Sequence, residues 1–269
     1  MIRAAILDMY DGTPNLGLTS IADVLKSEFP SIQFSMFDVR SRGKMPDLDF
    51  DIFISTGGPG HPLEGAWRWG DAYFGWLDQV IKHNANHEQK KYVLFICHSF
   101  QLACHHFGVG KITKRPKDSF GIFPMKKTEV GMRDHLFEHL PQPFYAADFR
   151  TYQVTEPNTK RIQEMGASIL AMEDPNHHDF PELAIMAIRF FPEMYGLQFH
   201  PEASPVGMTK YFGEVKRKKQ ILDRHGAAVY EEMMFHMRDP IKIGLTHRKL
   251  LPGFLKFVRA SLSEIAVTA

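Results

Sequence analysis

The chain has 269 residues, of which 44% are hydrophobic and 23% are charged, so it can bury one large hydrophobic core or two small ones. Its 32 Lys and Arg residues almost balance its 31 Asp and Glu residues. This balance predicts no polyanionic partner, and we expect no binding to nucleic acid.

The sequence also predicts no contact with membranes. No apolar run approaches the length of a transmembrane helix, and Asp8 interrupts the first apolar run too early for a signal peptide. Cys97 and Cys104 lie seven residues apart in one predicted strand–helix unit, which argues against a disulfide framework. We therefore expect a reducing compartment and a cytoplasmic location.

The N-terminal part alternates between predicted strands and helices. Buried strands are predicted at 2–9, 32–39 and 51–56, and apolar residues recur at helical spacing in 16–29 and 69–81. Strands that alternate with helices through short loops predict a parallel sheet with right-handed crossovers.

A glycine-rich loop, residues 57–60, follows the third of these strands. It has neither the Gly spacing of a dinucleotide-binding loop nor the Gly-Lys-Ser/Thr ending of a phosphate-binding loop, which argues against nucleotide binding. Paired glycines do allow a backbone N–H to approach a ligand closely, as an oxyanion hole requires.

The chain is organised around residues 91–110, a short apolar strand that runs directly into a helix ending at Gly108. Cys97 lies at the junction, where the first free N–H groups of a helix favour a thiolate. Cys97 is therefore a candidate nucleophile. The alternative is that it is a small buried apolar residue, which we expect of Cys104.

The second half of the chain shows little helical periodicity. Strands are predicted at 111–128 (broken near Pro116 and Gly121), 144–148, 169–172, 183–189 and 194–199. We expect them to form an antiparallel extension of the sheet. His135, Glu138 and His139 match a zinc-hydrolase pattern, but the segment is short and has no third ligand nearby, so we predict no metal and no cofactor.

The last predicted strand runs into His200-Pro201-Glu202. Residues two apart in an extended segment face the same way, so the Glu202 carboxylate can reach the imidazole of His200. Pro201 fixes the backbone between them. The alternative for this short motif is a salt link on the surface.

From Met208 onward helical periodicity returns, and we predict a helical extension at 206–269 that packs on a domain formed by 1–205. Residues 216–219 (KRKK) are strongly basic. They predict a solvated helix face, with a partner-docking surface as the alternative.

The glycine loop, the cysteine corner and the His-Pro-Glu segment, in this order, resemble the class I glutamine amidotransferase domain. The matching stretches are ISTGGPG (54–60), ICHSFQLA (96–103) and YGLQFHPE (195–202), and the resemblance covers about residues 1–205. It implies an α/β fold: a three-layer sandwich of flavodoxin-like type with a mostly parallel central sheet.

The resemblance also implies a Cys-His-Glu triad. Cys97 would attack the side-chain amide of glutamine and form a γ-glutamyl thioester, which water then cleaves. His200 would take the thiol proton and pass it to the departing ammonia, and Glu202 would orient the imidazole.

Four further residues take roles from the same resemblance. Backbone N–H groups of Gly58 and His98 would stabilise the tetrahedral oxyanion. Gly57 and Gln101 would bind the substrate in the glutamine pocket.

Several positions depart from the family pattern. Phe95 and Ser99 stand where the nucleophile motif has glycines, and we expect them to narrow or reshape the pocket floor. Ser119 replaces an acidic residue, and Phe149-Arg150 replaces a Ser-His pair near the glutamine backbone. Intact triad positions with altered recognition positions predict an active thiol site with a changed substrate preference.

Three functions remain open from the sequence. The protein could release ammonia from L-glutamine for a separate synthetase subunit. It could instead hydrolyse another γ-glutamyl amide or peptide on its own. The third alternative is a non-catalytic regulatory module on the same fold.

Overall fold

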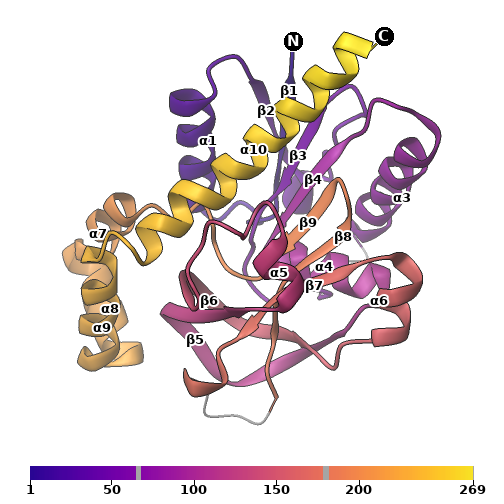
Figure 1. Cartoon of the computed structure of the whole chain (residues 1–269). Helices are drawn as coiled ribbons and strands as arrows, with labels where there is room; N and C mark the ends of the chain where they lie inside the picture. Colours follow the sequence, from indigo (N-terminus) through magenta and orange to yellow (C-terminus); the bar gives the residue numbers. More distant parts are fainter. Residues whose placement is uncertain (65–67, 178–181, 269) are drawn as a thin grey trace.

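The computed structural model describes residues 1–64, 68–177 and 182–268. Within these residues one sheet of nine strands runs through the molecule in the order β2-β1-β3-β4-β9-β8-β7-β5-β6 (Figure 1). The strands are β1 (Arg3–Asp8), β2 (Gln33–Asp38), β3 (Ile52–Ser55), β4 (Tyr92–Ile96), β5 (Lys111–Lys127), β6 (Phe144–Thr155), β7 (Ser168–Glu173), β8 (Ile185–Phe191) and β9 (Met194–Leu197). The helices are α1 (Leu16–Glu28), α2 (Val39–Arg42), α3 (Gly70–Asn86), α4 (His98–Phe107), α5 (Glu129–Arg133), α6 (Thr159–Met165), α7 (Pro205–Gly213), α8 (Val215–His225), α9 (Ala227–Arg238) and α10 (Ile243–Thr268).

The sheet has a parallel half and an antiparallel half. Strands β2, β1, β3, β4 and β9 are parallel to one another. From β9 the sheet continues through β8, β7, β5 and β6 with antiparallel pairs. The predicted α/β fold and its antiparallel extension are both confirmed.

Helices cover both faces of the parallel half, as a three-layer sandwich requires. Ala4 and Ile6 of β1 belong to the core that contains side chains of α1 and α10. Ala5 and Leu7 of the same strand belong to the opposite core, with side chains of α3 and α4. Strands buried on both faces in this way have continuous apolar sequences, which explains why they could be predicted.

The predicted C-terminal helices are present. Helices α7, α8 and α9 gather beside the β5–β6 ribbon, and α10 runs across the face of the sheet that α1 also covers (Figure 1). Ile221, Tyr230 and Met233 of α8 and α9 pack with Ile122 of β5 in a third apolar cluster. None of the described helices is long and apolar enough to cross a membrane.

The structure differs from the prediction mainly in polar segments. Strand β6 continues to Thr155, seven residues beyond the predicted end, because its buried Arg150 and Gln153 are held by polar contacts that a hydrophobic pattern does not reveal. Helix α6 was not predicted because it buries no residue and so shows no apolar periodicity. Strand β5 is one strand whose register shifts between Lys114 and Ser119.

Candidate active site

Cys97 occupies a strained corner between β4 and α4. Its φ of 50° and ψ of −99° are unusual for a residue with a side chain, and such a conformation costs about 1–3 kcal/mol. The surrounding bonds hold it: its N–H donates to the Leu197 carbonyl at 2.7 Å, and its carbonyl accepts from the Gln101 N–H at 3.1 Å. The thiol is thereby presented at the start of α4, although only 5% of the residue is exposed.

His200 and Glu202 lie beside Cys97 as the sequence predicts. The Nδ1 atom of His200 is 2.8 Å from Oε1 of Glu202. The Cys97 sulfur accepts a hydrogen bond from the Gln198 amide at 3.8 Å, and it is close enough to His200 to raise the pKa of the imidazole. A second backbone contact fixes the segment, since the N–H of His200 donates to the Ala147 carbonyl of β6 at 2.9 Å. The three side chains line the same pocket.

The charges around His200 favour its protonated form. Burial alone would lower the pKa of this imidazole, but Glu202 and Cys97 outweigh burial and raise the pKa well above 6.5. The Glu202 carboxylate itself lies at the N-terminus of α1, where the helix dipole favours negative charge. The site therefore holds a proton on His200 at neutral pH.

The glycine loop packs directly against these side chains. A Cβ at Gly57 would lie 2.9 Å from Cε1 of His200 and 3.5 Å from Cβ of Cys97. A Cβ at Gly58 would lie 2.3 Å from the Met9 carbonyl oxygen, a clash that the backbone cannot avoid. Gly57 thus allows the close approach of Cys97 and His200, and Gly58 lines the adjoining space.

Tyr10 and Gly17 belong to the site but were not singled out from the sequence. A Cβ at Gly17 would lie 2.7 Å from the Tyr10 hydroxyl and 2.9 Å from Oε1 of Glu202. Burial, with the nearby Glu202, Cys97 and Asp8, raises the pKa of Tyr10 well above 10, so its hydroxyl stays protonated. The turn residues before α1 mark a loop in the sequence. They do not indicate that this loop contacts Glu202.

Two pockets meet at Cys97, and both include Gly58. The polar pocket has a volume of about 500 Å³ and is lined by Gln101, Ser119, Arg150 and Tyr152, among others. The apolar pocket has a volume of about 300 Å³ and is lined by His200, Phe120, Phe149, Met208, Tyr211 and Phe212, among others. Gln101 is held in place because its amide donates to the Tyr152 carbonyl at 2.8 Å and to Gln198 at 3.0 Å.

His98 contributes its backbone rather than a charged side chain. It is the first residue of α4, where N–H groups have no partner within the helix. Burial, with Arg40 and His61, lowers the pKa of its imidazole to about 3, so the ring is neutral.

Comparison with known proteins identifies the family. A family model described as Glutamine amidotransferase class-I matches residues 18–218, well over half of the chain.

The chain belongs to the class I glutamine amidotransferase family.

Solved structures share this fold at low sequence identity. A glutamine amidotransferase from Thermotoga maritima is 14% identical with a TM-score of 0.67, covering 94% of this chain and 97% of that one. Another from Methylobacillus flagellatus is 14% identical with a TM-score of 0.69, covering 96% and 94%. A putative GMP synthase subunit from Thermoplasma acidophilum is 17% identical with a TM-score of 0.54, covering 83% and 98%. No curated protein matches the chain significantly in sequence.

The two residues that replace family glycines do not shape the pockets, so that part of the prediction is wrong. Phe95 is fully buried and packs edge-on against Phe190. Its side chain lies on the opposite face of β4 from the side chain of Ile96. The Ser99 hydroxyl donates to the Thr56 carbonyl at 2.6 Å and lies 2.8 Å from the Ser55 hydroxyl. Both side chains occupy the core beneath the site.

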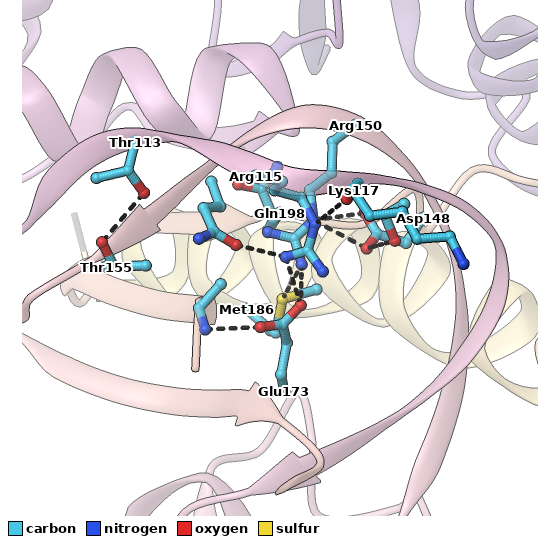
Figure 2. Close-up of polar contacts among 12 residues, drawn as sticks. Thr113, Arg115, Lys117, Asp148, Arg150, Thr155, Glu173, Met186 and Gln198 are labelled. Carbon is cyan, nitrogen blue, oxygen red and sulfur yellow. Dashed lines mark hydrogen bonds and ion pairs between the residues drawn. The ribbon is translucent and has the colours of Figure 1, made fainter. Parts of the chain in front are cut away.

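The replacements at Ser119 and Phe149-Arg150 do line the pockets. Arg150 lies in a buried ionic cluster with Arg115, Asp148 and Glu173 (Figure 2). Burial alone would lower the pKa of Arg150, but Asp148 and Glu173 raise it, so the guanidinium stays charged. Its Nη1 atom has no hydrogen-bond partner among the described residues.

The His135, Glu138 and His139 pattern lies on a turn. The ring of His135 packs against Phe257 at 4.3 Å, and His139 contacts Glu138 at 3.5 Å. In the described part of the chain, no three His, Cys, Asp or Glu side chains are placed to hold a metal ion. Cys104 is fully buried, as expected of a core residue.

We predict that Glu202→Gln lowers kcat/KM for amide hydrolysis by about 10²- to 10⁴-fold. Removing the carboxylate charge lowers the pKa of His200, so the alkaline limb of the pH–rate profile should move to lower pH. Steady-state kinetics across the pH range measure both effects. A wild-type rate and an unmoved limb would show that Glu202 does not act on His200.

We also predict that Glu173→Ala lowers the free energy of unfolding by about 3–5 kcal/mol, because it leaves Arg115 and Arg150 buried without this carboxylate. Asp223→Ala is the matched control: it removes an exposed carboxylate paired with Lys219 and should change stability by less than about 1 kcal/mol. Urea unfolding measures both. Equal losses in the two variants would contradict a structural role for the cluster.

Proposed function

We propose that the protein hydrolyses the γ-carboxamide of glutamine or of another γ-glutamyl compound through a thioester on Cys97. One observation carries this proposal: Cys97, on a strained corner at a helix start, lines the same pocket as a His200 that is itself held by Glu202. A nucleophile, a proton carrier and an acid that orients the proton carrier are the parts of an acyl-transfer site.

The reaction follows from these positions. The Cys97 sulfur bonds to the amide carbon, and the carbonyl oxygen becomes an oxyanion. When the C–N bond breaks, the proton held on His200 passes to the leaving nitrogen. Water then attacks the thioester, returns a proton to His200, and releases glutamate and the Cys97 thiolate.

The oxyanion donors are backbone groups. The N–H of His98 lies at the free N-terminus of α4, and Gly58 lines the pockets beside Cys97 without a side chain in the way. Preorganised N–H donors aimed at a developing oxyanion are among the largest contributions to catalysis of acyl transfer.

The polar pocket suits the glutamyl group. Glu64 lines this pocket and can pair with the α-ammonium, while the side chain of Arg150, which is 1% exposed, lies in its wall. Gln101 lines the same pocket, and Gly57 keeps the distance between Cys97 and His200 short.

Delivery of ammonia to a separate synthetase is the second candidate. The likeness to a putative GMP synthase subunit supports it. In this version the domain of residues 1–205 carries the chemistry, and the extension of residues 206–269 offers its exposed basic residues, such as Lys216, for docking.

We predict that wild-type protein releases glutamate from L-glutamine or a γ-glutamyl amide, and that Cys97→Ala lowers the rate by about 10³-fold or more. Cys104→Ala is the matched control, since it removes a buried thiol whose pKa burial raises well above 9. It should keep most of the activity. Glutamate assays and circular dichroism of both variants provide the measurement.

Residual activity of Cys97→Ala at the wild-type level would rule out the thioester. Release from no amide by well-folded wild-type protein would instead favour a non-catalytic module. Ammonia release that rises when a synthetase is added would support the second candidate.

A further inference from the structure

The apolar pocket carries an inference that rests on the proposed thiol hydrolysis. We propose that the preferred substrate is a γ-glutamyl amide whose amine carries an aromatic or bulky apolar group, and that this group lies in the apolar pocket as it leaves.

The position of His200 decides which pocket receives the leaving group. The proton donor must lie within hydrogen-bond reach of the departing nitrogen. His200 lines the apolar pocket but not the polar pocket, whereas Cys97 lines both. The acyl group therefore extends from Cys97 into the polar pocket, and the amine departs on the side of His200.

The apolar pocket is far larger than ammonia requires. Its volume is about 300 Å³, whereas a molecule the size of water or ammonia occupies roughly 30 Å³ in a liquid. The excess is enough for a phenyl or indole group, since ligand sites begin at about this size.

Aromatic rings line this space beside the triad. Phe212 lines the apolar pocket alone, whereas Phe120 and Phe149 also line the polar pocket. Phe149 lies 6.0 Å from the His200 ring, and Phe120, Phe149 and Phe212 lie 5.0–5.9 Å from one another. All three are only partly buried, although their rings pack together. An aromatic amine can stack against these rings in the geometry that aromatic pairs prefer.

The charges in the apolar pocket argue against an acidic leaving group. Among the described residues that line it there is no Lys or Arg, and its carboxylate, Glu202, is hydrogen-bonded to His200. The carboxylate of an amino-acid or peptide leaving group would find no Lys or Arg there. The charge on His200 is already paired with Glu202, and the incoming carboxylate would lie near that acid. An uncharged apolar group leaves no buried charge unpaired and is not repelled by Glu202.

The wall of the apolar pocket comes from the C-terminal helices. Met208, Tyr211 and Phe212 belong to α7, and the Phe212 carbonyl accepts a hydrogen bond from the Tyr230 hydroxyl of α9 at 3.3 Å. Helix α7 therefore determines substrate specificity under this proposal, while the strand ends perform the chemistry. The leaving amine takes one proton from His200, and no other reactant than water is needed.

The test compares kcat/KM of wild-type protein for γ-glutamyl benzylamide, L-glutamine and γ-glutamylglycine, each followed by glutamate release. Benzylamine and ammonia have similar basicity, so a difference between them reports binding of the ring. We expect the benzylamide to exceed glutamine by at least about 10-fold, and γ-glutamylglycine to be the poorest of the three.

Two variants localise the effect. Phe212→Leu, which keeps an apolar side chain, should lower the ratio of kcat/KM for benzylamide over glutamine by about 10-fold. Phe235→Ala is the matched control, because Phe235 of α9 is an aromatic residue of the same extension that is 66% exposed and lines neither pocket. It should leave both values unchanged.

The outcomes separate this inference from the proposed function. Glutamine hydrolysis at least as efficient as benzylamide hydrolysis, or a preference for γ-glutamylglycine, would overturn the inference and leave the thiol hydrolase intact. Hydrolysis of none of the three by wild-type protein would overturn both.

Discussion

The site depends on the carboxyl ends of neighbouring parallel strands meeting at one edge of the sheet. Strands β1, β3, β4 and β9 lie side by side, so Tyr10, Gly57, Cys97 and His200 all follow strand ends that point the same way. Ligands bind at this edge in open α/β sheets. Because glycines follow β3, the backbone comes within contact distance of Cys97 and His200, and the positive φ of Cys97 is maintained by bonds from its neighbours.

Buried charge is arranged in two separate groups around this edge. Glu202 is balanced by His200 and by the N-terminus of α1, and the carboxylate raises the pKa of the His200 imidazole. Arg150 is balanced by Asp148 and Glu173 on the antiparallel strands. A buried arginine without these carboxylates would be costly, so the cluster fixes a cation in the wall of the polar pocket. The antiparallel half of the sheet thus contributes the buried ionic cluster, while the parallel half positions Cys97.

The sequence could predict the parallel strands and the position of Cys97, His200 and Glu202 after strand ends, because each follows a short apolar run. The catalytic roles of these residues stay predictions. The sequence could not predict Gly17, because its role depends on α1 packing against a residue far along the chain. The prediction for Phe95 was wrong for a similar reason. Successive side chains of a strand point to opposite faces of the sheet, and here they enter two different cores. Which of the two faces lies next to the pocket depends on the helices that cover the sheet.

The C-terminal helices are joined to the chemistry more closely than their sequence indicates. The Thr246 hydroxyl of α10 donates to the Tyr145 carbonyl of β6 at 2.5 Å, two residues before Ala147, whose carbonyl accepts from the N–H of His200. In the proposed reaction the strand-end residues would make the same bond changes whatever amine departs, so they would not select a substrate. Under this proposal the substrate is selected by segments that pack beside the strand ends. Here these segments are α7 and the β5–β6 ribbon, which line the apolar pocket together with His200. Variation in those segments can change the substrate without disturbing the triad.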